Sequence, residues 1–188
     1  MFRKLIFVGT VLFLFFISAS GQITKGFWMF GGNGSLRSGT FSLPGNEFKS
    51  TQINIQPRVG FFPSDKFATG ILLNYSFNRN KQAIGPAGSA STFGVGPFVR
   101  YYLLSKEKQV NLLAEANGLY NWQTGSLNSK SGQTEYSIVA GPAIFLNTSV
   151  AVEILTGYRY SKETQSNGSL GKEFLIQIGL QVYLERAR

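Results

Sequence analysis

Five charged residues stand singly within largely apolar stretches of the chain: Arg58, Arg100, Glu115, Glu153 and Arg159. The two glutamates could in principle form a carboxylate pair of the kind that works as general acid and base. Beside three arginines they are better suited to ion pairs, because charges inside a protein must be paired and hydrogen-bonded. We therefore expect a structural polar network, with a ligand or ion site at the same place as the alternative.

The chain lacks the residue types on which most catalytic and metal chemistry depends. Its 188 residues include no histidine and no cysteine. Histidine is the most frequent general base and the usual activator of a serine nucleophile, and His and Cys are the usual ligands of transition metals. The glycines at 31–34 and 94–96 complete neither a dinucleotide-binding nor a P-loop pattern. We predict no catalytic site, no cofactor site and no metal site.

The elements that must position the charged residues show an alternation of apolar and polar side chains. Near the C-terminus, Ile176, Ile178 and Leu180 alternate with Gln177 and Gln181. Because a strand repeats every two residues, such a segment has one apolar and one hydrated face. The same pattern predicts eight strands, at residues 24–35, 48–62, 67–79, 92–104, 109–123, 133–146, 150–163 and 173–184.

The connections between these strands alternate in length. Short ones fall at residues 63–66, 105–108 and 147–149, and longer polar ones at 37–47, 80–91, 124–132 and 164–171. Short turns on one side and long loops on the other are typical of outer-membrane barrels. The predicted fold is all-β, an eight-stranded antiparallel up-and-down transmembrane β-barrel. An even strand count leaves both termini on the periplasmic side and the long loops extracellular.

The first 21 residues have the features of a cleaved signal peptide. Arg3 and Lys4 precede an apolar run at 5–17 that is too short to span a bilayer, and small residues follow it. We predict removal of residues 1–21 and a single barrel domain at 22–188, with a membrane-anchoring helix as the alternative. Only 14% of the residues are charged although 43% are hydrophobic, and this dispersed apolar content suits a membrane barrel.

The formal net charge of +9 comes from positive residues that stand singly, without a cluster resembling a nucleic-acid-binding arm. We therefore expect no nucleic-acid partner. Several positive residues fall on one predicted rim, where they would meet lipid phosphates: Arg37, Lys49, Arg79, Lys81, Lys130, Lys162 and Lys172. The expected partners are outer-membrane lipid, lipopolysaccharide and, during biogenesis, the barrel assembly machinery. The expected oligomeric state is a monomer.

Aromatic residues concentrate near the predicted strand ends, as in the two interfacial belts of membrane barrels. The residues predicted to lie at the membrane interface are Trp28, Phe61, Tyr101, Tyr120, Trp122, Tyr160 and Tyr183, and Phe145 is assigned to the same belt on the short-turn side. Proline cannot donate to a strand ladder, so Pro57, Pro97 and Pro142 are each predicted to occupy a bulge.

The run from Pro57 to Gly70, PRVGFFPSDKFATG, resembles a recurring stretch of the small outer-membrane β-barrel domain proteins of Bacteroidetes-type bacteria. Phe61 replaces the family's usual Tyr, and Lys66 its usual Asn. Residues 96–102 resemble the family's fourth strand and 25–28 its first, so the likeness covers nearly all of the mature chain. The resemblance implies an eight-stranded barrel similar in architecture to the transmembrane domain of outer membrane protein A, and an outer-membrane location.

Further polar residues are expected to face the interior: Asn54, Gln56, Asn117, Gln177 and Gln181. An eight-stranded barrel is just wide enough for its own side chains to fill, whereas wide porin channels need about 16 strands. We expect a non-enzymatic barrel with a structural role or a surface-binding (adhesion) role through its extracellular loops. The alternatives are a narrow channel or lateral port for small solutes and a soluble ligand-binding barrel.

Overall fold

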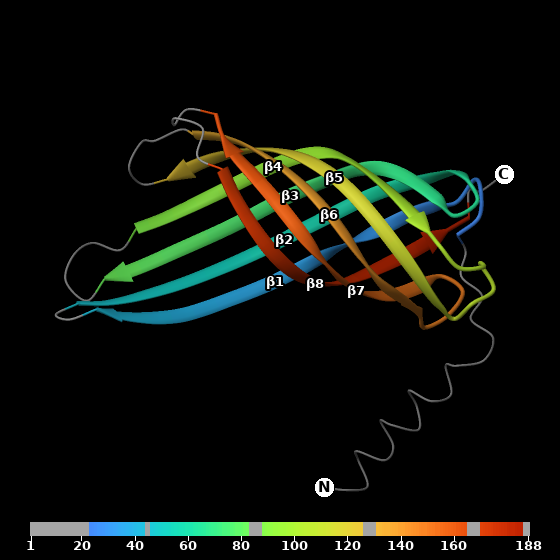
Figure 1. Ribbon diagram of the computed structural model, residues 1–188, viewed down its shortest axis with the longest axis horizontal. Coiled ribbons are helices and arrows are strands. Elements are labelled where there is room, and N and C mark those ends of the chain that lie inside the picture. The colour runs from blue at the N-terminus through green and yellow to red at the C-terminus, as the bar shows by residue number, and fades with distance from the viewer. Residues whose placement is uncertain (1–22, 44–45, 83–87, 126–130, 165–169, 186–188) are drawn as a thin grey trace, which may run out of the picture.

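In the computed structural model the chain forms one closed barrel of eight antiparallel strands, each paired with its neighbours in sequence (Figure 1). The predicted all-β, up-and-down barrel is confirmed. The structure describes residues 23–43, 46–82, 88–125, 131–164 and 170–185, so the predicted signal peptide lies outside the described residues. The strands are β1 (Trp28–Leu43), β2 (Asn46–Ser64), β3 (Phe67–Gln82), β4 (Gly88–Tyr102), β5 (Val110–Gly125), β6 (Ser131–Phe145), β7 (Val150–Glu163) and β8 (Leu170–Leu184).

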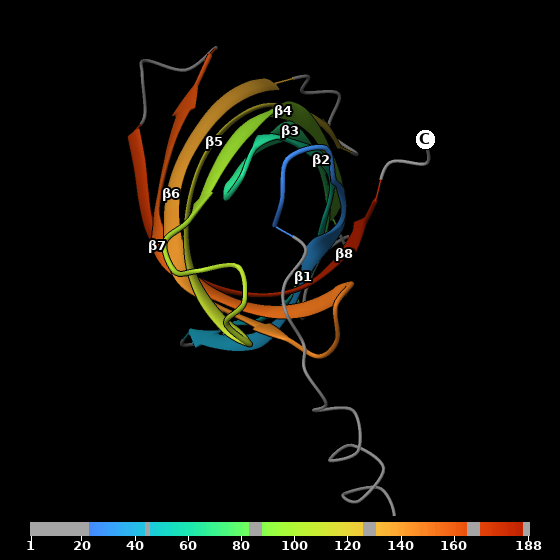
Figure 2. The same ribbon diagram turned by 90° about the vertical axis from the view of Figure 1, so that its right-hand side faces the viewer.

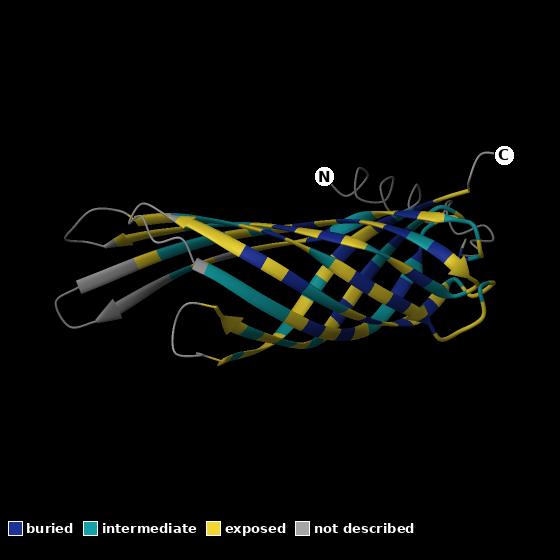
Figure 3. Cartoon of the chain, turned by 90° about the horizontal axis from the view of Figure 1, so that it is seen from above, coloured by how far each residue is buried: buried dark blue, intermediate teal, exposed yellow. Residues whose placement is uncertain are grey.

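The two-residue alternation of the sequence becomes an inner and an outer surface of the barrel. In β5, Leu113 and Glu115 are buried, whereas Leu112 between Asn111 and Leu113 is 44% exposed. Figure 3 shows this alternation as a checkerboard of buried and exposed residues. The outer wall is largely apolar, with exposed side chains that include Ile71, Leu73, Val99, Leu112, Ile138, Ile154, Ile176 and Ile178. A soluble barrel would turn such faces inward. Among the described residues, no helix is long and apolar enough to cross a membrane.

The two ends of the barrel differ. We call the end with the β2–β3, β4–β5 and β6–β7 connections the turn side; β1 begins and β8 ends there too (Figure 1, right). The predicted contrast in connection length is wrong, because the strands extend into the predicted loops: the β4–β5 connection spans 103–109, whereas those at the other end span 44–45, 83–87, 126–130 and 164–169. The opposite end is the loop side. At the turn side the segment before β1 is tied to the β2–β3 turn, because Gly26 donates to the Phe62 carbonyl and Lys66 donates to the Ile23 carbonyl, each at 2.9 Å. The Ile23 side chain is buried there.

The first strand was predicted in part wrongly. It begins at Trp28 and runs to Leu43, beyond the predicted 24–35, and β2 resumes at Asn46. Most of the predicted loop at 37–47 is therefore a continuous hairpin. The glycine run hid the alternation, yet it is needed at the β1–β2 contact, since a Cβ on Gly32 would lie 2.6 Å from the Gln56 carbonyl oxygen.

The predicted bulges at Pro57, Pro97 and Pro142 are absent. At each proline the pairing with the following strand lapses over two residues and then resumes in the same register. For example, Val95 faces Tyr120 and Phe98 faces Asn117 on either side of Pro97. The missing N–H therefore interrupts the ladder without inserting a residue. The register shift in β2 lies instead between Phe61 and Ser64.

The seam that closes the barrel is short. β1 and β8 pair through seven residues each, Trp28–Gly34 with Ile178–Leu184. Beyond them, Ser35–Leu43 pair only with β2, and Leu170–Gln177 pair only with β7, among the described residues. The β1–β8 seam is thus closed near the turn side and unpaired toward the loop side.

Candidate functional site in the barrel interior

Four of the five predicted interior charges meet in one buried network. Arg100 on β4 lies between two carboxylates, with Nη2 at 2.6 Å from Glu115 Oε2 and Nη1 at 2.5 Å from Glu153 Oε1. Arg58 on β2 forms an ion pair with the same Glu115 oxygen. All four side chains are at most 1% exposed.

Strand parity and register bring these charges together. Arg100 and Glu115 are direct partners in the β4–β5 ladder, so their side chains enter the lumen side by side. The two arginines and two glutamates balance in formal charge, as buried ions require. Asn117 adds a hydrogen bond from Nδ2 to Glu115 Oε1 at 3.1 Å, and Gln181 donates to Glu153 at 3.2 Å. The four charges are thus all paired, as a structural network needs, although Arg58 Nε and Gln181 Oε1 have no hydrogen-bond partner among the described residues.

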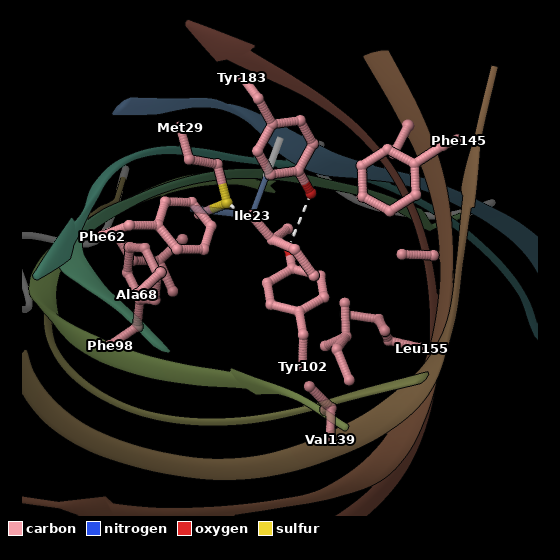
Figure 4. Close-up of a cluster of buried hydrophobic side chains, with 14 of the residues drawn as sticks. Ile23, Met29, Phe62, Ala68, Phe98, Tyr102, Val139, Phe145, Leu155 and Tyr183 are labelled. Carbon is pink, nitrogen blue, oxygen red and sulfur yellow. Dashed lines mark hydrogen bonds between the residues drawn. The ribbon is translucent and has the colours of Figure 1, made fainter. Parts of the chain in front are cut away.

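Aromatic and apolar side chains pack against this network at the turn side. The hydroxyls of Tyr102 and Tyr183 lie 2.7 Å apart (Figure 4). Arg100 donates to the Tyr102 hydroxyl at 3.0 Å. The Phe62 ring lies 6.0 Å from that of Tyr102, and the Phe145 ring lies 5.4 Å from that of Tyr183. We call this assembly the turn-side plug; its members are Met29, Arg58, Phe62, Arg100, Tyr102, Glu115, Phe145, Glu153 and Tyr183. These buried side chains come from the strands of the ring that Figure 2 views from this end.

A row of amide side chains crosses the lumen next to the plug. Asn33 donates to Gln177 at 3.0 Å, Gln177 to Gln56 at 3.3 Å, and Gln56 to Asn74 at 3.4 Å. Asn74 in turn donates to Asn121 at 2.9 Å. The row joins β1, β8, β2, β3 and β5, so it braces the barrel at mid-height.

The loop-side half of the lumen contains a cavity of about 490 Å³. Its wall is mostly amide and hydroxyl side chains, and its charged residues are Glu135, Arg159 and Glu173. The prediction that Arg159 belongs to the buried network is therefore wrong. Arg159 instead lies 3.6 Å from Glu135 and 3.8 Å from Glu173. Arg159 sits near the loop-side end of β7, whereas Glu153 on the same strand sits near the turn side. Among the described residues, no group of three His, Cys, Asp or Glu side chains could hold a metal ion.

Most of the predicted interfacial aromatics face outward. Trp28, Tyr101, Tyr120, Trp122 and Tyr160 are between 40% and 49% exposed. Phe61 is half-buried, with its ring 5.3 Å from that of Trp28.

Tyr183 was placed wrongly, and so was Phe145, since both are fully buried in the lumen. Tyr183 shares the parity of Gln177 and Gln181, which already indicated an inward direction. Parity is therefore a better indicator of the direction of Tyr183 than its nearness to a strand end.

The sequence reading missed the large apolar side chains of the interior. Met29, Phe62 and Tyr102 are fully buried, and Phe98 is 1% exposed. The available signal was again parity, because Phe98 and Tyr102 alternate in step with Arg100 on β4. Where the inward residues of a strand include aromatic side chains, both faces of that strand appear apolar in the sequence. The inward face is then difficult to recognise from the alternation alone.

No protein-family model matches the chain, and no curated protein matches it. Among solved structures the chain is similar to Neisserial surface protein A (NspA), with 16% sequence identity and a TM-score of 0.47. The match covers 84% of this chain and 97% of that one. At this level of similarity nothing about function transfers to the chain.

Proposed function

We propose that this protein is a non-enzymatic, integral outer-membrane β-barrel that acts as a rigid scaffold and presents its loop-side connections for surface binding. The observation that carries the proposal is the composition of the outer wall. Along β8 the outward residues from Leu184 to Phe174 are apolar, and the next outward residue is Lys172. An apolar band that ends in interfacial and charged side chains is the surface that a bilayer requires.

Cationic side chains mark the loop-side border of this band. Lys49 on β2 lies directly opposite Lys81 on β3, and Thr51 lies opposite Arg79. All three cations are exposed and share the parity of the outward residues. Like charges on directly opposed residues repel each other, so a bound anion would relieve that repulsion. We propose that phosphate groups of lipid or lipopolysaccharide bind Lys49, Arg79 and Lys81.

The scaffold role follows from the plug. The buried ion pairs and aromatic rings occupy the turn-side half of the lumen, which supports a scaffold over a through-channel. The proposed orientation places the turn side and both chain ends in the periplasm and the loop side outside the cell. The residues of the Pro57–Gly70 motif support membership of the Bacteroidetes-type barrel family as part of the same proposal. We further propose that the barrel is a monomer inserted by the barrel assembly machinery.

Cell fractionation with heat-modified electrophoresis tests the membrane proposal. The protein should sediment with outer membranes, and the unboiled barrel should migrate differently from the boiled chain in detergent. Recovery in the soluble fraction, or identical migration before and after boiling, would contradict it. Planar-bilayer recordings test the scaffold role, since the plug predicts no steady conductance at any applied voltage.

The lateral-port alternative is supported by one specific observation, the unpaired part of the β1–β8 seam. It differs from a through-channel, because a ligand would enter from the side and would not have to pass the plug.

A further inference from the structure

The loop-side cavity borders a gap in the wall of the barrel, which we call the opening. If the β1–β8 register continued past Gly34 and Ile178, Ser35 would face Gln177 and Leu36 would face Ile176. Neither pair forms, although all four residues are described. These same four residues line the cavity, so the gap in the ladder is an edge of the cavity.

The opening lies within the apolar band. Seven paired residues on a strand tilted by about 40° rise about 18 Å, less than the band of about 25 Å typical of outer-membrane barrels. On the unpaired part of β8, Phe174 is 61% and Ile176 is 66% exposed, and both lie on the turn side of Lys172. The unpaired seam is therefore level with the hydrocarbon of the loop-side leaflet.

Unpaired strand edges are costly at this depth. Backbone N–H and C=O groups facing hydrocarbon have no hydrogen-bond partner, and irregular backbone is tolerated there only where it lines a water-filled cavity or is covered. The unpaired backbone of Ser35–Leu36 and Ile176–Gln177 is tolerated on this ground, because all four residues line the cavity. A ligand with polar groups at the opening would meet this condition as well.

The cavity wall indicates the chemistry of such a ligand. Its side chains are mainly amides and hydroxyls, including Gln52, Asn54 and Gln133, and each of these groups offers both donors and acceptors. Hydroxyl groups match this pattern, because they also donate and accept. Arg159 is flanked by Glu135 and Glu173, so the charged groups among the described lining residues have a formal charge of −1 and include no cation without a carboxylate partner. Outside the opening, Leu36, Phe174 and Ile176 form an apolar surface.

We propose that the loop-side cavity and the open β1–β8 seam bind a membrane amphiphile with a neutral, hydroxyl-bearing head group. The head group enters between Ser35 and Gln177, and the alkyl chain lies against Leu36, Phe174 and Ile176. This inference rests on the membrane location proposed above. It adds a ligand site that the scaffold role does not require.

Photolabelling of the full chain in phosphatidylcholine nanodiscs tests the proposal. The probe is dodecyl maltoside carrying a diazirine in its alkyl chain, and labelled peptides are mapped by mass spectrometry. Labels should concentrate on peptides containing Leu36 and Phe174–Ile176, and unlabelled dodecyl maltoside should compete. A dodecyl phosphate probe should label these peptides at least ten-fold less; equal labelling would overturn the head-group assignment.

Two variants test the opening itself. Ser35→Trp places an indole at the β1 edge of the cavity and should lower the site-specific labelling at least ten-fold. Ser91→Trp on β4, an outward position next to Phe93, is the matched control and should leave labelling within two-fold. Gln177→Leu removes the amide at the β8 edge without large bulk and should lower labelling about five-fold, which keeps the test decisive if Ser35→Trp fails to fold.

The outcomes separate this inference from the proposed function. A heat-modifiable barrel that inserts into nanodiscs but is labelled evenly around its wall, or equally in wild type and Ser35→Trp, would overturn the ligand site and leave the membrane barrel intact. A chain that fails to insert would instead contradict the membrane proposal.

Discussion

The two halves of the lumen hold charged groups in opposite ways. In the turn-side plug, Arg58, Arg100, Glu115 and Glu153 are almost wholly removed from solvent, and the Arg100–Glu115 and Arg100–Glu153 ion pairs measure 2.6 and 2.5 Å. In the loop-side cavity, Arg159 is 23% exposed, and its ion pairs with Glu135 and Glu173 measure 3.6 and 3.8 Å. The first arrangement leaves no room for a ligand, whereas the second lines a cavity of about 490 Å³.

This difference follows the closure of the wall. The plug lies where β1 and β8 are paired and where the Ile23–Phe27 segment is tied to the β2–β3 turn. The cavity lies where β1 and β8 have separated. We therefore expect the closed half to contribute most of the stability of the barrel and the open half to offer the space for a ligand. The predictions that follow test this division, beginning with the largest expected effect.

Glu115→Gln should destabilise the barrel strongly. It removes the carboxylate shared by Arg58 and Arg100 and leaves one buried negative charge, Glu153, for two buried arginines. Breaking a buried ion pair by removing one partner costs about 3–5 kcal/mol. Denaturant unfolding of the barrel in lipid vesicles, followed by tryptophan fluorescence, measures the change in the free energy of unfolding.

Glu173→Gln is the matched control from the cavity half. Its side chain is 62% exposed and 3.8 Å from Arg159, so the expected loss is below about 1 kcal/mol. If Glu115→Gln and Glu173→Gln lowered the free energy of unfolding equally, the plug would not stabilise the barrel more than the cavity half does.

Tyr102→Phe should have a smaller but measurable effect. The change removes a hydroxyl that lies 2.7 Å from the Tyr183 hydroxyl and accepts a hydrogen bond from Arg100. A buried polar group left without its partner costs about 1–3 kcal/mol. Tyr120→Phe on the outer wall, where the side chain is 49% exposed, should change the free energy of unfolding by less than about 0.5 kcal/mol. A loss for Tyr120→Phe as large as that for Tyr102→Phe would contradict the assignment of stability to the plug.

The smallest predicted effect concerns the exposed rim of the closed half. The Lys25 backbone N–H donates to Asp65 Oδ1 at 2.8 Å, and this hydrogen bond lowers the pKa of the Asp65 carboxyl, with Lys106 as a further contributor. Because the folded-state pKa of Asp65 lies below its unfolded value, the ionised carboxylate stabilises the folded barrel at neutral pH. This stabilisation is lost as the pH falls from about 4 through the folded-state pKa.

Asp65→Asn should therefore make the stability of the barrel slightly less sensitive to acid than that of the wild type. The measurement compares the denaturant midpoints of wild type and Asp65→Asn at pH 7 and at pH 3. A wild-type midpoint that falls no further than that of the variant would contradict the role of the Lys25 contact.

The sequence predicted the barrel well because alternation is a local property that survives in every strand. It predicted the position of β1 poorly, because Gly31, Gly32 and Gly34 carry no side chains that report a face. All five interior charges could be selected as inward-facing by parity. Parity does not tell which of these charges contact each other. Arg159 and Glu153 lie six residues apart on β7, and this separation places Arg159 in the loop-side half of the lumen and Glu153 in the turn-side half. The open seam depends on how far two strands at opposite ends of the chain remain paired, and no local pattern encodes that.

Site-resolved amide hydrogen exchange of the folded barrel in nanodiscs tests the central division most directly. The β8 amides that point toward β1 should be strongly protected from Ile178 to Leu184 and should exchange rapidly from Gly171 to Gln177. The alternate amides that point toward β7 should be protected along both stretches and serve as the internal control. Uniform protection of the β1-facing amides along the whole of β8 would contradict the account, because the barrel would then be closed in both halves.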